Sequence, residues 1–206
     1  MTIILDLGGV IMQHNMDACV AHFRELIGSE AVEYALGLTN STIGTEHGQN
    51  LIEQFEKGNI STEGFLSTLL SYAKTGTTSD DLKDAWNLMH GGIPAERLAL
   101  LRRWRDDGHH LFMLSNNNAL HWEDVFNKYD LSMFEHCFAS HLLHCSKPDP
   151  AIYELVDTYL HTHQLGMPYH FVDDLAVNRH AAESVGWHTY PDLESLNVVL
   201  QQSKKV

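Results

Sequence analysis

Five short and largely apolar runs, at residues 3–5, 111–114, 137–139, 169–172 and 187–190, constrain the fold more than any other feature of this sequence. Apolar runs of this length without polar alternation are typical of strands that are buried on both faces of a sheet. Helical patterns lie between them, and the clearest, over residues 152–160, has apolar residues at i, i+3, i+4, i+7 and i+8. Another helix is expected from Pro94 to Gly108. Alternating strands and helices predict an α/β fold with a parallel sheet flanked by helices.

Residues 15 to about 90 break this alternation. Phe23 with Ile27 and Leu51 with Phe55 show helical spacing, and no strand pattern separates them. We therefore expect an inserted all-helical segment at residues 15–90, whereas residues 1–14 and 91–206 together form the sheet-containing core. The glycine pair at 91–92 is a candidate flexible boundary.

Charge and composition exclude several functions. The 206 residues carry 13 Lys and Arg against 27 Asp and Glu, a net charge of −14 that repels nucleic acid and anionic membranes. An apolar run long enough to span a membrane is absent from the sequence, and its first residues lack the pattern of a signal peptide. Three cysteines without metal-ligand spacing argue against a disulfide framework, so we expect a cytoplasmic protein.

Polar residues follow four of the predicted strands. They are Asp6, then Ser115 and Asn116, then Lys147, and finally Asp173 and Asp174. Ligands of open α/β sheets bind beyond the carboxyl ends of the strands, so these side chains are expected to converge. Three carboxylates beside a lysine and a hydroxyl suit a hard divalent cation such as Mg²⁺ together with a phosphate group. Taken singly, Asp6, Ser115, Asn116 and Lys147 are also compatible with a turn, a helix cap or a solvated loop. The adjacent Asp173 and Asp174 are harder to explain in that way, because like charges beside a buried strand repel unless a cation lies nearby.

These residues stand in four motifs that resemble, in order and spacing, those of the haloacid dehalogenase (HAD) superfamily. The motifs are Asp-Leu-Gly-Gly-Val at 6–10, Leu-Ser-Asn at 114–116, Lys-Pro-Asp at 147–149, and Phe-Val-Asp-Asp at 171–174 followed by Asn178. The resemblance covers essentially the whole chain and implies a Rossmann-like core with a C1 helical cap. The first motif is similar to the form found in the branch that contains bacterial α-glucose-1-phosphate phosphatase.

The resemblance implies a nucleophile and a metal site. Asp6 would attack phosphorus and form an aspartyl-phosphate. The Asp6 carboxylate, the Gly8 carbonyl oxygen, Asp173 and Asp174 would hold Mg²⁺, which offsets the repulsion between nucleophile and phosphate. Asn178 would brace the metal-binding loop from behind.

The same resemblance implies a phosphate-binding set. Ser115 and the backbone N–H of Asn116 would bind phosphoryl oxygens. Lys147 would neutralise charge that develops in the transition state and keep Asp6 ionised. The catalytic residues are therefore expected to be Asp6, Ser115 and Lys147.

The sequence departs from the family pattern at Gly8. Related phosphatases carry a second aspartate there, which donates a proton to the leaving group and later accepts one from water. Glycine keeps the main-chain carbonyl but removes this carboxyl group. His14 and His90 are conceivable substitutes by position alone.

We therefore expect a Mg²⁺-dependent phosphatase that hydrolyses a small phosphorylated metabolite, with a sugar phosphate favoured by the resemblance alone. Nucleic acid and membranes are not expected as partners, and the oligomeric state is left open. Two alternatives remain. One is a 2-haloacid dehalogenase, which needs no metal, so the paired aspartates argue against it. The other is a catalytically idle module that binds a phosphosugar or a protein partner.

Overall fold

The computed structural model describes residues 1–35 and 51–203 of the 206. By their contacts they form two compact units. The first, here called the sheet unit, comprises Met1–Gln13, Gly92–Asn116 and the chain from Asp130 onward. The second, called the helical unit, comprises His14–Gly91 and Asn117–Tyr129. Each is described by itself.

The sheet unit is built on five parallel strands, as the sequence predicts. They are β1 (Thr2–Leu5), β4 (His110–Ser115), β5 (His136–Ala139), β6 (Tyr169–Val172) and β7 (His188–Tyr190). Their order is β5-β4-β1-β6-β7, so β1 lies in the centre. Leu5, the last residue of β1, pairs with Met113 of β4 and Val172 of β6. The residues that follow these three strands therefore emerge at the same edge of the sheet.

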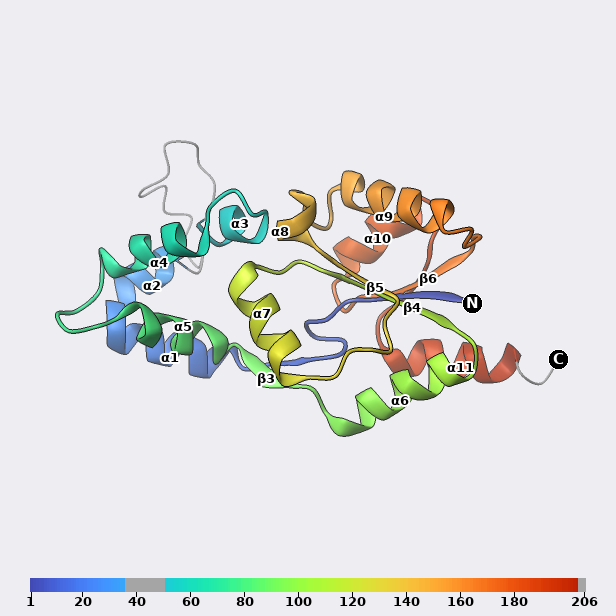
Figure 1. Ribbon diagram of the computed structural model, residues 1–206, viewed down its shortest axis with the longest axis horizontal. Helices are drawn as coiled ribbons and strands as arrows, with labels where there is room; N and C mark the ends of the chain where they lie inside the picture. The colour runs from blue at the N-terminus through green and yellow to red at the C-terminus, as the bar shows by residue number, and fades with distance from the viewer. Residues whose placement is uncertain (36–50, 204–206) are drawn as a thin grey trace. The chain divides into compact units, whose positions relative to one another are not determined.

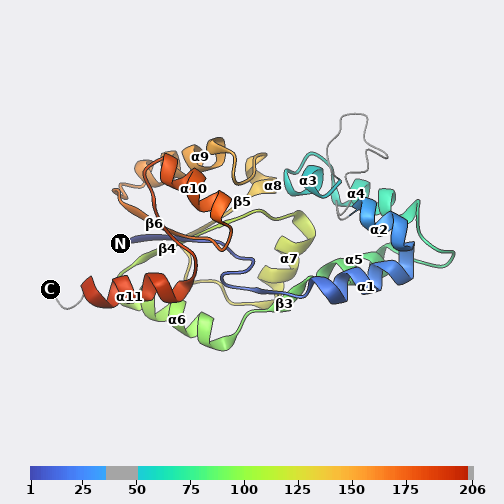
Figure 2. The ribbon, with the colours of Figure 1, turned by 180° about the vertical axis from the view of Figure 1, so that it is seen from behind.

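Helices cover both faces of this sheet (Figures 1 and 2). On one face lie α6 (Ala95–Asp106) and α11 (Leu193–Ser203), and on the other lie α9 (Pro150–Thr162) and α10 (Ala176–Ser184). A short helix, α8 (Ser140–Leu143), directly follows β5. The Trp104 indole of α6 donates a hydrogen bond of 3.2 Å to Asn197 of α11 and ties the first pair together.

Apolar burial on both faces explains the strand pattern. Ile4, Phe112 and Phe171 join Tyr153 and Trp187 in one core with α9 and α10. The neighbouring strand residues, which are just as buried, point to the opposite face because side chains alternate along a strand. A strand between two helical layers has no solvent face, so its sequence shows no polar alternation.

The described part of the helical unit contains six helices. They are α1 (Met16–Ile27), α2 (Ser29–Ala35), α3 (Leu51–Glu56), α4 (Thr62–Leu70), α5 (Ser79–Asn87) and α7 (Ala119–Lys128). An aromatic cluster forms their core: the Phe55 and Phe65 rings stack at 4.2 Å, and the Trp86 ring lies 5.1 Å from Phe65. Residues 36–50 of the predicted insert lie outside the described residues.

Two features of the structure differ from the sequence prediction. The segments β2 (Gln13–His14) and β3 (His90–Gly92) pair as a two-stranded sheet, although they are too short and polar to show a strand pattern. In addition, α7 was expected in the core at 91–206 but packs with the helical unit. The Trp86 indole donates to the Asn118 side chain at 3.2 Å, and the His121 ring stacks on Trp86 at 4.8 Å.

None of the helices in the described part of the chain is long and apolar enough to cross a membrane. The longest of them, α9, has 13 residues, whereas a bilayer span needs about 20.

Candidate active site

The loop after β1 presents Asp6 at the carboxyl edge of the sheet. The Asp6 N–H still donates to the Val172 carbonyl oxygen at 2.9 Å, so its backbone continues the pairing of β1 with β6. The chain then turns back on itself, because the N–H groups of Ile11 and Met12 both donate to the Leu7 carbonyl oxygen, at 2.9 and 2.7 Å. The Leu7 N–H donates to the Asp6 carboxylate at 2.7 Å. Asp6 is thus a buried carboxylate at a fixed position.

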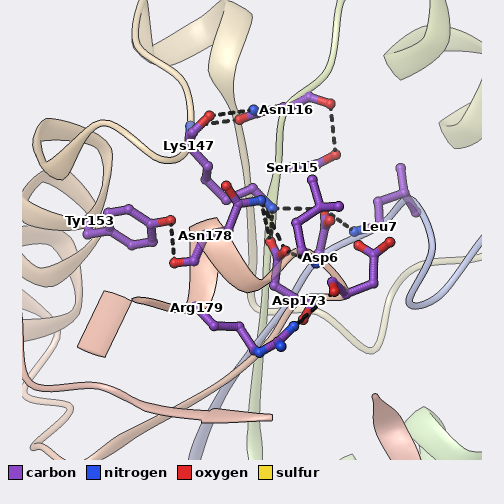
Figure 3. A network of polar contacts seen from close by, with 11 residues as sticks. Asp6, Leu7, Ser115, Asn116, Lys147, Tyr153, Asp173, Asn178 and Arg179 are labelled. Atoms are coloured by element: carbon purple, nitrogen blue, oxygen red, sulfur yellow. Dashed lines mark hydrogen bonds and ion pairs between the residues drawn. The ribbon is translucent and has the colours of Figure 1, made fainter. Parts of the chain in front are cut away.

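Lys147 enters the site from the loop between α8 and α9. Its backbone forms a reciprocal pair with the Asn116 side chain: the Asn116 amide nitrogen donates to the Lys147 carbonyl oxygen, and the Lys147 N–H donates to the Asn116 amide oxygen, both at 2.8 Å. Asn116 directly follows β4, so this pair joins the ends of two neighbouring segments (Figure 3). The neighbouring Ser115 is buried, and its hydroxyl lies 3.4 Å from the Asn116 carbonyl oxygen.

The loop after β6 holds Asp173 firmly. Its carboxylate accepts hydrogen bonds from the Asn178 amide at 3.0 and 3.1 Å and from the Leu175 N–H at 2.9 Å. Asn178 is itself fixed, since its carbonyl oxygen accepts a 2.9 Å hydrogen bond from the Tyr153 hydroxyl on α9. Asp173 is fully buried, whereas Asp174 is exposed.

Lys147 bridges two of the carboxylates. Its ammonium nitrogen lies 2.6 Å from an Asp173 oxygen and 3.0 Å from an Asp6 oxygen, and these side chains are buried (Figure 3). Burial raises the pKa of Asp6 to about 6, because the lowering by Lys147 is incomplete and Asp173 raises it further. Burial alone would lower the pKa of Lys147, but the adjacent Asp6 and Asp173 outweigh it and raise that pKa. Lys147 is therefore a permanent cation.

The arrangement fits a divalent cation. Asp6, Asp173 and Asp174 each offer a carboxylate oxygen, and these oxygens lie within 4.8 Å of one another. One lysine cannot neutralise three carboxylates. Burial is the main reason that the pKa of Asp6 is raised, and the charge of Asp173 raises it further. Hard oxygen donors of this kind suit Mg²⁺. Gly8 lies in the turn after Asp6 and is half-buried; its carbonyl stays a predicted ligand.

Two neighbours of this cluster were missed by sequence reasoning. Gly9 has a φ of +75°, and a Cβ placed there would lie 2.6 Å from the Asp174 carboxylate carbon. A side chain at position 9 would therefore displace Asp174. Arg179, in the first turn of α10, donates to the carbonyl oxygens of Asp173 and Asp174 at 2.7 and 2.9 Å. Its only sequence signal is its place next to Asn178, because its partners are backbone atoms.

The proposed substitutes for the missing acid belong to the helical unit. His90 lies 3.1 Å from Asp124, which also binds Lys128, and its ring is 4.2 Å from that of His121. Burial lowers the pKa of His90, although the hydrogen bond to Asp124 opposes this. His14 is exposed at the end of β2. Gly8 itself offers no proton donor.

Comparison with known proteins gives the same picture of the fold. No protein-family model matches the sequence. A HAD family enzyme from Bacteroides thetaiotaomicron, solved with magnesium and inorganic phosphate, superposes with a TM-score of 0.76 at 26% identity over 92% of each chain. Structural neighbours of the present chain are thus HAD family enzymes. A predicted HAD-like family hydrolase from Porphyromonas gingivalis gives a TM-score of 0.77 at 26% identity over 97% of both chains.

A more distant structural neighbour shows that a shared fold does not decide which reaction is catalysed. L-2-haloacid dehalogenase from Xanthobacter autotrophicus has a TM-score of 0.56 and 14% identity over 91% of this chain and 75% of its own. At that identity the likeness concerns the HAD fold alone. The choice between phosphate and halide chemistry therefore depends on the residues at the site.

Proposed function

We propose that this chain is a Mg²⁺-dependent hydrolase of small phosphomonoesters, of the HAD type, in which the helical unit acts as the cap. The observation that carries the proposal is the cluster of three carboxylates, Asp6, Asp173 and Asp174, with oxygens within 4.8 Å of one another and Lys147 bonded to two of them. The magnesium and phosphate bound by the similar Bacteroides enzyme give it independent support.

Asp6 is the proposed nucleophile. Its carboxylate oxygen attacks phosphorus, the bond to the leaving alcohol oxygen breaks, and water later hydrolyses the aspartyl-phosphate at phosphorus. Fixing by the Leu7 N–H and by Lys147 keeps that oxygen oriented. When bound, Mg²⁺ held by the three carboxylates supplies positive charge beside both reacting anions.

Ser115, Asn116 and Lys147 are the proposed phosphate-binding residues. Lys147 remains protonated at neutral pH because two carboxylates stabilise its charge. It can therefore offset negative charge that grows on the phosphoryl oxygens. The reciprocal hydrogen bonds of Asn116 with the Lys147 backbone hold the segment that carries Ser115 next to the loop that carries Lys147.

The substrate is the least constrained part of the proposal. Similarity of the first motif to the branch containing α-glucose-1-phosphate phosphatase favours a sugar phosphate. The acidic protein, at a net charge of −14, does not attract nucleic acid or anionic lipid at long range. A small cytoplasmic phosphorylated metabolite agrees with both points.

The decisive experiment is a phosphate-release assay over sugar phosphates, nucleotides and aryl phosphates, with Mg²⁺ or with chelator. Wild type should release phosphate only with Mg²⁺, and Asp6→Asn should be inactive. Asp106→Asn is a matched control, because Asp106 is exposed and pairs with neighbouring Arg105. Full activity of Asp6→Asn, or of chelated wild type, would remove the assignment.

Two further measurements, of halide release and of ligand binding, identify the alternatives. Halide release from 2-haloacids without metal would indicate a dehalogenase, which the clustered aspartates disfavour because three adjacent carboxylates need a cation. Binding of Mg²⁺ and phosphate without turnover of any phosphomonoester would indicate the idle binding module, which Gly8 keeps open because it removes a proton donor.

A further inference from the structure

We propose that Arg179 is a positioning residue that sets the affinity of the carboxylate cluster for its cation. This inference rests on the proposed function, since it assumes that Asp6, Asp173 and Asp174 hold Mg²⁺. One guanidinium nitrogen of Arg179 donates to the carbonyl oxygens of both Asp173 and Asp174, at 2.7 and 2.9 Å. Figure 3 shows Arg179 beneath the loop.

The two aspartates of this loop are held in different ways. The Asp173 carboxylate is fixed by side-chain and backbone donors, namely Lys147, Asn178 and the Leu175 N–H. By contrast, the exposed Asp174 carboxylate has no hydrogen-bonded partner among the residues that the structure describes. The place of the Asp174 carboxylate therefore depends on its backbone.

Two contacts determine that backbone position. Arg179 binds the Asp174 carbonyl oxygen, and Gly9 packs so close to the carboxylate that a Cβ would clash with it. The contact with Gly9 only excludes positions, whereas the hydrogen bonds from Arg179 hold the chain in place. Without Arg179, the peptide units at 173 and 174 lose their common donor, and Asp174 can turn away from the other carboxylates.

Local helix stability does not account for an arginine here. Arg179 lies in the first turn of α10 (Ala176–Ser184), where the positive end of the helix dipole repels a cation. Leu175 at the N-cap makes no side-chain hydrogen bond that would offset this. The guanidinium attracts the Asp192 carboxylate, and that attraction is the smallest of the causes that lower the pKa of Asp192. Its direct contacts are the charged hydrogen bonds to the two carbonyls, and these are stronger than neutral ones.

A plain charge effect and a positioning effect predict opposite results. Removing a positive charge beside the cluster should tighten Mg²⁺ binding if Arg179 acted only as a nearby cation. Loss of the hydrogen bond to the Asp174 backbone should weaken Mg²⁺ binding, because the Asp174 carboxylate must then be ordered before it can bind the ion. The sign of the change in Mg²⁺ affinity therefore separates the two explanations.

The test is titration calorimetry of Mg²⁺ into the full-length wild type, Arg179→Met, Arg179→Lys and Arg102→Met, with thermal unfolding in chelator as a check on folding. Arg179→Met should lose about tenfold in Mg²⁺ affinity, the order expected for a lost charged hydrogen bond. Arg179→Lys keeps the charge and one donor, so it should recover part of the loss. Arg102→Met is the control, because Arg102 pairs with exposed Asp130 on the surface and should not change affinity.

Unchanged or tighter Mg²⁺ binding by folded Arg179→Met would overturn the inference. If Arg179→Met does not fold, Arg179→Lys decides: an affinity equal to wild type would overturn the inference, and a weaker one at an unchanged melting temperature would support it. Failure of the wild type itself to bind Mg²⁺ would instead refute the metal site, and with it both proposals. The two failures are therefore distinguishable.

Discussion

Replacing Lys147 by methionine should destabilise the sheet unit strongly, and the loss should shrink in mild acid. The Lys147 ammonium lies 2.6 Å from Asp173 and 3.0 Å from Asp6, with side-chain exposures of 1%, 0% and 11% for these three residues. Methionine has a similar length but leaves both carboxylates without their cation. Breaking a buried ion pair from one side costs about 3–5 kcal/mol, and we expect a loss of that size at pH 8 without metal.

The pH dependence follows from Asp6. Even with Lys147 present, burial raises the pKa of Asp6 to about 6 in the folded protein, against about 3.9 in the unfolded chain. Removing the lysine raises the folded-state pKa further. The folded variant then binds a proton that the unfolded chain does not bind, so its stability rises as the pH falls. The gap between wild type and variant should therefore narrow between pH 8 and pH 5.5.

Urea unfolding in chelator at pH 8 and pH 5.5, followed by circular dichroism, measures both effects. Lys83→Met is the control, since Lys83 pairs with Asp80 at 3.1 Å and the two side chains are 39% and 87% exposed. A surface pair of that kind contributes about 0–1 kcal/mol. A loss for Lys147→Met no larger than the control, or a gap that is the same at both pH values, would refute this reasoning.

Two further predictions concern Gly8 and His121. Because Gly8 supplies no proton, rates should fall steeply from aryl to alkyl phosphates, and Gly8→Asp should help alkyl substrates most, within the ~10²–10⁴-fold range of general acid catalysis. Rates over a graded series test this, and a shallow wild-type dependence would show that another group donates the proton. In the helical unit, burial and then His90 lower the pKa of His121 to about 3, so acidification from pH 7 to pH 5 should cost about 2 kcal/mol as the unfolded histidine gains a proton. His121→Gln should remove this cost in urea unfolding, and an unchanged pH dependence would contradict it.

The strands and the residues at their ends could be predicted because both depend on short stretches of sequence. Residues 3–5 and 169–172 are largely apolar because helices cover both faces of the sheet. Asp6 and Asp173 follow those strands directly, and parallel pairing brings such positions to one edge. The resemblance to the HAD motifs added proposed roles that the pattern alone does not give.

Contacts with distant residues or with backbone atoms account for what the sequence did not reveal. The helical pattern of α7 shows that one of its faces is apolar, but not that Trp86 is the residue it packs against. Gly9 lies against the Asp174 carboxylate, which is more than 150 residues away in the sequence. Arg179 is only a few residues from Asp173 and Asp174, but it binds their backbone carbonyl oxygens. Neither contact leaves a mark in spacing or hydrophobicity.

The membership of α7 in the helical unit has a consequence for engineering. The polypeptide passes between the two units four times, after Gln13, Gly91, Asn116 and Tyr129. A graft of residues 14–91 alone onto another core would leave Leu120 and His121 behind, and Trp86 would lose its contacts with Asn118 and His121. A transplantable helical unit must therefore carry two pieces of chain, and the second begins immediately after Asn116. Exchanging the helical unit of this protein means rebuilding the chain next to Asn116, a proposed phosphate-binding residue.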